Sequence, residues 1–350
     1  MCKLELSLMP NLPSKPPASR PTSGATVSIS AVAELAGVSI ATVSRVINGV
    51  ANKASAVTIS RVHKAIEQLG YRPLGAGRAL RRGESRLVAV LAANLANPSM
   101  AAIAAAAEVA LRGAGYVMVL CDTHERPELQ DEYLLEMRAQ YARGLILLGA
   151  VDSPVLRRFV AAGESLVFVS RRSPVACPNE KFVGIDNLMA GQAVAAWMAQ
   201  QVFKTVALIH GRLTSSATAE RVVGFRQALK ANSMTLPKSR IQTADGTEHL
   251  QIGYEGMTRL LAGSTVPHAV FCTSDLIAYG ANRRAAEAGL QGGRDIAFVG
   301  FDDNPLNPWV APWLHAVRVP YAQYGTAIVS ALTSEAGQSI ILPHQLVIRG

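Results

Sequence analysis

Residues 39–48, SIATVSRVIN, carry side chains that could contact nucleic acid. The apolar residues Ile40, Val43, Val46 and Ile47 recur at helical spacing, with short hydroxyl groups and one guanidinium between them. This pattern is typical of a helix that buries one face and exposes the other. Hydroxyl and guanidinium groups donate hydrogen bonds to phosphate oxygens and to base edges. The segment therefore predicts a helix that packs against a core on one side and contacts DNA on the other.

Three short helices would position this polar face. We expect the first over residues 31–36, with Ser28 or Ser30 as its cap, and the second over residues 39–47. A third is expected over about residues 57–69. A glycine-containing turn separates the first two helices. That arrangement is typical of a helix-turn-helix, whose second helix can lie in the major groove.

Basic residues are concentrated in the same part of the chain. The first 85 of the 350 residues contain 11 Lys or Arg and 4 Asp or Glu, a net charge of +7. The remainder contains 23 and 21, a net charge of +2. A basic segment joined to a nearly neutral body indicates that one end meets a polyanion. A basic solvated tail is the alternative that charge alone leaves open.

The N-terminus and the cysteines indicate a cytoplasmic, nucleoid-associated protein. Residues 1–26 are rich in Pro and Ser and lack the continuous apolar core of a signal peptide, so we expect a disordered leader or a mis-assigned start. No run of about 18 apolar residues is present to predict a membrane span. The four cysteines are widely spaced, and Cys121 with His124 lacks further ligands, so no disulfide, metal or cofactor is predicted.

From residue 86 onward, apolar strand patterns alternate with amphipathic helices. LVAVLAAN (87–94) and AVFCTS (269–274) are examples, each followed by a helical pattern. This order is typical of parallel sheets with helices on both faces, and two such series predict two doubly wound lobes with a ligand between the carboxyl ends of their strands. We therefore expect an all-α headpiece over 27–72, a hinge linker over 73–85, and an α/β body over 86–350. Within the body, the first lobe is expected over 86–185 and 302–323, and the second over 186–301 and 324–350.

Motifs of nucleotide binding and catalysis are absent. No GxGxxG follows the first strand, and GxxxxGK[ST], GxSxG and HExxH do not occur. We therefore predict neither a bound nucleotide nor catalytic residues. A solute-binding protein without a DNA role is the alternative, because the two-lobed body has that architecture.

Several sequence motifs occur in a fixed order along the chain: VSISAVAELAGVSIATVSRVIN (27–48), LGYRPLGAGRAL (69–80), NPS (97–99), GIDN (184–187), ERVVGF (220–225), SDLIAYG (274–280), GFDD (300–303) and PWLHAVRVP (312–320). Together they resemble the LacI/GalR family of bacterial transcription regulators, from Val27 nearly to Gly350. The resemblance implies a homodimer, acting as a repressor, that binds a pseudo-palindromic operator. It also implies that a small molecule between the lobes, a sugar or sugar acid, controls operator affinity.

The resemblance assigns DNA contacts to the headpiece. Ile40 and Ala41 match the positions that choose bases, and because both are apolar we expect them to contact thymine methyls. Arg45 matches another base-contacting position. Ile59 stands where the family has Arg, which removes one phosphate contact. The remaining DNA-binding residues predicted here are Ser28, Ser39, Thr42, Ser44 and Asn48.

The linker resembles a hinge that becomes helical on DNA. Leu80, preceded by Ala79, matches the leucine that each subunit inserts into the minor groove, which kinks the duplex. Leu74 stands where the family usually has Asn, and Gly75 and Gly77 replace better helix formers. Each glycine costs about 0.5–1 kcal/mol in a helix relative to Ala. We therefore expect this hinge to order less readily.

In the body, Arg221 and Asp275 match positions that contact the effector. They could bind vicinal hydroxyls or an acid group, and an ordinary interlobe ion pair is the alternative. Ser170 stands where an Asp is common, beside Arg171 and Arg172, which favours an anionic effector over a neutral sugar. The other effector-binding residues predicted are Ser99, Met100, Ser170, Arg171 and Phe301.

The regulatory switch would be closure of the lobes, which changes the spacing of the two headpieces in the dimer. Induction and corepression both stay open, because the sequence does not give the sign of the coupling. The chain ends at LVIRG without a leucine heptad. This ending predicts a dimer rather than a tetramer linked by C-terminal tails.

Overall fold

The chain forms two compact units, one within residues 1–77 and the other within residues 78–350. We name the described part of the first unit the headpiece and that of the second unit the body. The computed structural model describes residues 27–48, 54–71, 85–246 and 248–349.

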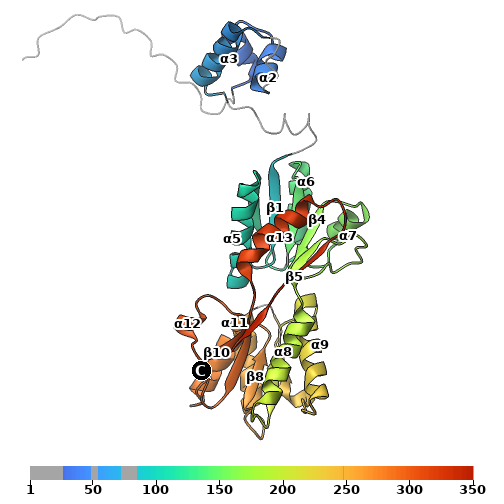
Figure 1. Cartoon of the computed structure of the whole chain (residues 1–350), viewed down its shortest axis with the longest axis vertical. Coiled ribbons are helices and arrows are strands. Elements are labelled where there is room, and N and C mark those ends of the chain that lie inside the picture. The colour runs from blue at the N-terminus through green and yellow to red at the C-terminus, as the bar shows by residue number, and fades with distance from the viewer. Residues whose placement is uncertain (1–26, 49–53, 72–84, 247, 350) are drawn as a thin grey trace, which may run out of the picture. The chain divides into compact units, whose positions relative to one another are not determined.

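The headpiece consists of three helices whose ends follow from serines and glycines. Helix α1 spans Ile29–Ala36, α2 spans Ile40–Ile47 and α3 spans Ala56–Leu69 (Figure 1). Each helix begins after a serine whose hydroxyl accepts a backbone N–H of the first turn. Helices α1 and α3 end at glycines in the left-handed region, with φ of 63° and 62°. The predicted helix-turn-helix is confirmed.

The buried faces of the three helices form a small apolar core. Val43 and Val46 of α2 are 0% and 6% exposed, and they pack with Val32 of α1 and Val62 of α3. Ile47 packs against the same cluster from a partly exposed position. Val43, Val46 and Ile47 therefore lie on the core side, as predicted, whereas Ile40 is exposed on the opposite face of α2.

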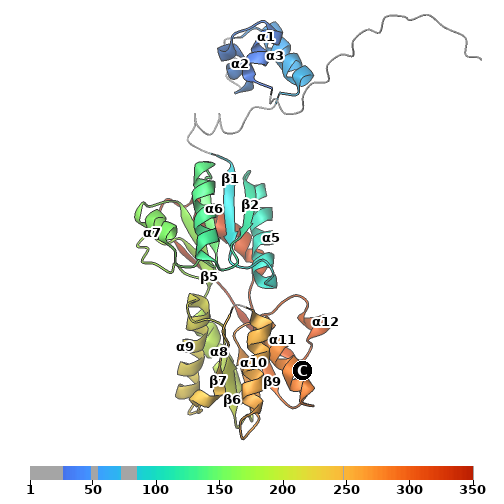
Figure 2. The ribbon, with the colours of Figure 1, turned by 180° about the vertical axis from the view of Figure 1, so that it is seen from behind.

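The first lobe of the body is a parallel sheet in the order β11-β5-β4-β3-β1-β2. Alternate strand residues pack against α5 and α13 on one face and against α6 and α7 on the other (Figure 2). Its elements are β1 Leu87–Ala92, α5 Pro98–Gly113, β2 Val117–Asp122, α6 Pro127–Ala139, β3 Gly144–Leu148, α7 Pro154–Ala161, β4 Leu166–Val169, β5 Phe182–Ile185, α13 Tyr321–Thr333 and β11 Ser339–Leu342.

The second lobe is a sheet in the order β12-β10-β9-β8-β6-β7, in which only the β10–β12 pair is antiparallel. Helices α8 and α9 cover one face, and α10 and α11 cover the other. Its elements are α8 Asn187–Gln200, β6 Val206–Ile209, α9 Ser216–Ala231, the 3-10 helix Lys238–Arg240, β7 Ile241–Gln242, α10 His249–Leu261, β8 Ala269–Cys272, α11 Asp275–Glu287, β9 Ala297–Asp302, α12 Asn307–Val310, β10 Leu314–Arg318 and β12 Gln345–Val347.

The lobe boundaries differ from the expectation after residue 301. Strand β10 continues the second sheet, where Leu314 pairs with Phe298 of β9, so residues 302–318 do not belong to the first lobe. Helix α13 and strand β11 complete the first lobe, where Ser339 pairs with Phe182 of β5. The chain therefore crosses between lobes near residues 186, 319–320 and 343–344. The expectation failed because local apolar patterns do not say which sheet a strand joins.

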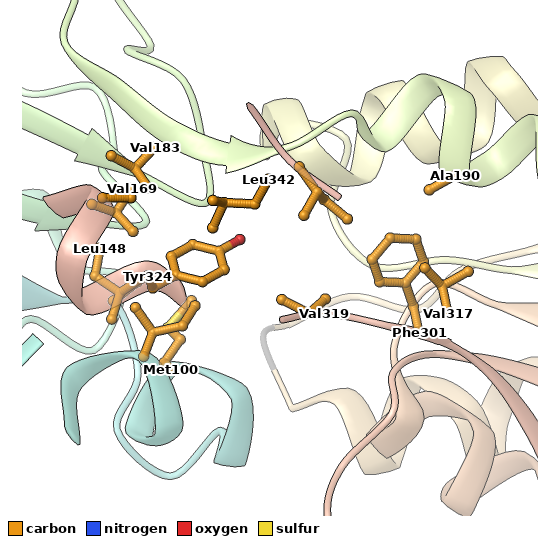
Figure 3. Close-up of a cluster of buried hydrophobic side chains, with 14 of the residues drawn as sticks. Met100, Leu148, Val169, Val183, Ala190, Phe301, Val317, Val319, Tyr324 and Leu342 are labelled. Atoms are coloured by element: carbon orange, nitrogen blue, oxygen red, sulfur yellow. The ribbon is translucent and has the colours of Figure 1, made fainter. Parts of the chain in front are cut away.

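A continuous apolar cluster crosses from one lobe to the other. It includes Met100 and Tyr324 on the first-lobe side and Phe301 on the second, with Val319 of the connecting segment between them (Figure 3). The hydroxyl of Tyr324 is directed toward the side on which Val319 and Phe301 lie (Figure 3). At the 319–320 crossing, Val319 is thus packed inside the protein, whereas Pro343 at another crossing is exposed.

In the described ranges, no single helix is long and apolar enough to cross a membrane. Helices α1 and α2 reach that length and composition only together, and they are bent by 103° relative to each other.

Candidate DNA interface and effector cleft

The candidate DNA-contacting surface is the face of α2 opposite its buried valines. Ser39, Ile40, Ala41 and Arg45 are exposed, and Ile40 exposes 48% of its surface although it is apolar. The Arg45 Nε donates to the carbonyl of Ala41 at 3.3 Å, so its side chain lies along the helix. The structure therefore brings these predicted residues onto one accessible face.

Two helix N-termini meet beside this face. The Ser39 hydroxyl accepts the N–H of Thr42 at 3.2 Å, and Ser55 accepts the N–H of Thr58 at 3.3 Å. With Arg45, these four residues line a hollow of about 310 Å³ between α2 and α3. Helix N-termini carry unpaired N–H groups and partial positive charge, so the hollow suits a phosphate. Ser55 and Thr58 were not predicted, although the repeated SxxT spacing was a signal for them.

The other predicted DNA-binding residues have separate positions. Asn48 Nδ2 donates to the Ser44 carbonyl at 2.7 Å, which ties both residues into the end of α2. Ser28 caps α1 by accepting the Ala31 N–H at 3.2 Å. Ala79 and Leu80, with the rest of residues 72–84, lie outside the described residues. Ile59, which stands where the family has Arg, packs against the headpiece core.

A cavity of about 470 Å³, which we name the interlobe cavity, lies between the two lobes of the body. Its walls are loops and helix starts at the carboxyl ends of strands from both sheets, the usual ligand position in open α/β folds. Its volume lies in the range of small-molecule sites. The lining residues are Glu125, Pro127, Ala150, Val151, Asp152, Arg171 and Pro174 of the first lobe, and Arg212, Thr214, Ser215, Thr218, Gly246, His249 and Ile252 of the second.

Arg221 is fixed near this cavity by contacts on three sides. Its Nε donates to Asn187 Oδ1 at 2.8 Å, and an NH group donates to the Thr273 carbonyl at 2.8 Å. The guanidinium carbon lies 3.4 Å from the ring centroid of Phe301. Burial lowers the pKa of Arg221, and the charge of Asp302 acts in the opposite direction. These hydrogen bonds occupy two of the five guanidinium N–H donors, so a ligand could accept from the others.

Asp302, which was not predicted, joins the two lobes together with Tyr321. The Tyr321 hydroxyl lies 2.9 Å from the Asp302 carbonyl and 3.1 Å from the Ser99 hydroxyl, and Ser99 also hydrogen-bonds the Asp302 carboxylate. Burial raises the pKa of Asp302 to about 6, while Arg221 and the Ser99 hydrogen bond hold it down. Asp302 has a φ of 113°, which is rare for a non-glycine residue and frequent at binding sites. The GFDD motif at the end of a buried strand was the available signal.

Asp275, in contrast, is 2% exposed and supports the loop that follows β9. Its Oδ2 accepts the N–H of Asn304 at 2.7 Å and the side-chain amide of Asn307 at 2.9 Å, whereas its buried Oδ1 has no partner among the described residues. Burial and the neighbouring Asp302 raise the pKa of Asp275 well above its usual range. These contacts place Asp275 against the loop that follows β9, and, like Arg221 and Asp302, it is not among the residues that line the interlobe cavity.

The three residues that follow β4 have different surroundings, and two of them, Ser170 and Arg171, were predicted to bind the effector. Ser170 has a φ of 67°, which turns the chain sharply at the end of the strand. Arg171 lines the cavity and pairs with Glu125 at 2.6 Å, and both side chains are largely buried. Arg172 pairs with Glu180 at 2.7 Å instead and does not line the cavity. The Arg172 guanidinium stacks on Phe182 of the first lobe.

His249 supplies a neutral polar group to the cavity. Its Nδ1 lies 2.9 Å from the hydroxyl of Ser274. Burial lowers the pKa of His249 to about 4, although the charge of Glu125 acts to raise it. At neutral pH this imidazole therefore carries no charge, and it can exchange hydrogen bonds with a ligand without attracting an anion or a cation.

Both units match models of one protein family. Residues 28–73 match the model described as bacterial regulatory proteins, lacI family, and residues 85–311 match that of periplasmic binding proteins and the sugar binding domain of the LacI family. The HTH-type transcriptional regulator PtxS of Pseudomonas putida is 30% identical over 333 residues, 93% of this chain and 95% of that protein. The transcriptional repressor CytR of Escherichia coli is 28% identical over 332 residues, 91% of this chain and 94% of that protein.

Solved structures of the same kind cover nearly the whole chain. The lac repressor dimer bound to operator and the anti-inducer ONPF has a TM-score of 0.78 and 26% identity, over 93% of this chain and 98% of that one. The complex of the transcriptional regulator CelR with cellobiose has a TM-score of 0.68 and 27% identity, over 92% of this chain and 99% of that one.

Proposed function

The chain belongs to the LacI family of bacterial regulatory proteins, and from this premise we propose that it is a repressor that binds operator DNA as a homodimer. Helix α2 enters the major groove, where Ile40 and Ala41 contact thymine methyls and Arg45 reaches a base edge. The hollow between α2 and α3 holds a backbone phosphate. The observation that carries this proposal is the exposed, serine-capped face of α2, whose opposite side packs in the headpiece core.

A small hydroxylated molecule, a sugar or sugar acid, controls operator affinity from the interlobe cavity. Arg221, Asp302 and Ser99 offer the paired donors and acceptors that vicinal hydroxyls require. Met100, Ser170, Arg171 and Phe301 contribute to the same site, and Asp275 positions the loop beneath it. A ligand that bridges the lobes stabilises one of their arrangements and so couples to the headpieces. The protein acts in the cytoplasm, where the chromosome provides its operator.

DNA binding is tested by selection of duplexes from a randomised library, followed by mobility-shift titration with the selected site at several salt concentrations. We expect a pseudo-palindromic site and an affinity that falls steeply with salt. Arg45→Ala should relax base preference at one position of each half-site, and Arg226→Ala, an exposed arginine of the body, serves as the control. Recovery of no preferred sequence would overturn the proposal.

A further inference from the structure

The charges around the interlobe cavity are unevenly paired. Arg171 is neutralised by Glu125 at 2.6 Å, and Asp152 lies beside Arg157 in an ion pair. His249 is neutral because burial holds its pKa near 4. These lining groups therefore contribute no net charge toward a ligand.

Arg212 is the exception among the lining residues. It follows β6 on an exposed turn, and in the described part of the chain no carboxylate or hydrogen-bond partner contacts its guanidinium. The next lining residues, Thr214, Ser215 and Thr218, form the N-terminus of α9, a helix of 16 residues. The unpaired cation and the positive end of this helix face the same cavity.

An unpaired guanidinium beside a cavity favours a ligand with a negative group, because a neutral hydroxyl gains less from a charged donor than a carboxylate does. On the opposite side, Arg221 is already fixed by Asn187 and the Thr273 carbonyl and interacts with the charge of Asp302, so that side suits hydroxyl groups. Arg171 and His249 connect the two sides, since both line the cavity and both interact electrostatically with Arg221.

We propose that the effector is a monoanionic polyhydroxy acid whose carboxylate binds Arg212 and the N-terminus of α9. Its hydroxyl groups contact the cluster formed by Arg221, Asp302 and Ser99. Arg171 and Arg172 do not select the anion, because each is already paired with a glutamate. This inference rests on the proposed function, since it specifies the ligand of the regulatory cleft.

The test is isothermal titration of the full chain with C4–C6 aldonates, represented by gluconate, and with sorbitol, the neutral alditol that has the same carbon skeleton as gluconate. We expect an aldonate to bind at least tenfold more tightly than its alditol, and less tightly as salt is raised. Arg212→Ala should weaken aldonate binding ten- to hundredfold, the range of one charge-assisted hydrogen bond. Arg212→Lys should recover part of the loss, and Arg226→Ala should bind like the wild type.

Two results overturn the proposal. One is tight binding of an alditol or neutral hexose that Arg212→Ala leaves unchanged, and the other is failure of every C4–C6 aldonate to bind the wild-type chain. Circular dichroism of Arg212→Ala establishes that a loss of binding is not a loss of fold. Mobility-shift titration with the selected operator reports separately on DNA binding, so a neutral effector that alters it would reject the anionic class while the repressor proposal stands.

Discussion

A methyl group added at Gly191 should both destabilise the second lobe and displace Arg221, for which we propose a role in effector binding. Helices α8 and α9 pack so closely there that a Cβ would lie 2.2 Å from the carbonyl oxygen of Arg221 and 3.0 Å from the backbone N of Phe225. Carbon–oxygen contacts between backbones are ordinarily about 3.3 Å or longer. In the Gly191→Ala variant, helices α8 and α9 must therefore move apart by about 1 Å.

This separation has two measurable consequences. Overpacking of this kind costs about 1–3 kcal/mol of the free energy of unfolding, and each kcal/mol lowers the Tm of a domain of this size by about 2–4 °C. A 1 Å movement of α9 also lengthens the 2.8 Å hydrogen bonds from Arg221 to Asn187 and to the Thr273 carbonyl beyond bonding range. The guanidinium then loses the orientation in which it would meet a ligand.

The assay is thermal and urea unfolding followed by tryptophan fluorescence, because Trp197 lies on α8 itself. Gly113→Ala is the matched control: Gly113 ends α5 and has open space where the Cβ would be. That control should keep its stability or gain up to about 1 kcal/mol. The reasoning is refuted if Gly191→Ala unfolds at the wild-type midpoint and a crystal structure of the variant places Arg221 unchanged.

Three further predictions concern hydroxyl and carboxyl groups. Ser39→Ala removes the acceptor for the Thr42 N–H and should lower the free energy of unfolding of the headpiece by about 1 kcal/mol, measured by unfolding titration. Ser39→Asp keeps the cap but should abolish operator binding, measured by mobility-shift titration, because its carboxylate repels the phosphate. The pKa of Asp302 is about 6 when folded and about 3.9 in an unfolded chain, so the native state holds more protons between these values. The free energy of unfolding should therefore fall by about 2 kcal/mol as pH rises from 4 to 6, and Asp302→Asn, measured by urea titration across that range, should lose this contribution. Tyr321→Phe loses the hydroxyl contacts to Ser99 and to the Asp302 carbonyl and should lower the free energy of unfolding by about 1–2 kcal/mol in urea titration. An unchanged midpoint would show that these contacts between the lobes do not stabilise the protein.

The parts of the fold that the sequence predicted are those governed by neighbouring residues. Ser39 and Gly37 mark helix ends because a side-chain acceptor and a left-handed glycine act within one turn. Strands such as LVAVLA at 87–92 were recognised because burial on both faces requires a continuous apolar run. Local chemistry decided these elements, and distant contacts did not overturn it.

The assignment of strands to lobes after residue 301 failed because it depends on pairing partners far along the chain. Ser339 of β11 pairs with Phe182 of β5, and Ala316 of β10 pairs with Val347 of β12 in the antiparallel sense. No periodicity within these short segments distinguishes one sheet edge from the other. The crossings between lobes follow from these pairings and so were equally hidden.

The candidate effector site was partly predictable. Arg221 was predicted from its motif, and the structure surrounds it with Asn187, Thr273 and Phe301. Asp302 was not predicted: Asp275 and Asp302 both follow buried strands, and only the structure shows that the charge of Asp302 acts on Arg221 while Asp275 bonds Asn304 and Asn307.

The charge of a binding site is decided by which groups lack partners, not by which groups are present. Two consecutive arginines, Arg171 and Arg172, looked like an anion site in the sequence, yet Glu125 and Glu180 neutralise them from 46 and 8 residues away. Arg212 was not predicted, because it lies in no recognised motif, and only the structure shows that no carboxylate among the described residues contacts it. If an anion is the ligand, its selection therefore comes from Arg212, a cavity residue that no carboxylate contacts in the described part of the chain. Replacing Arg212 should change ligand class, while replacing Arg172 should change only the local stability of the first lobe.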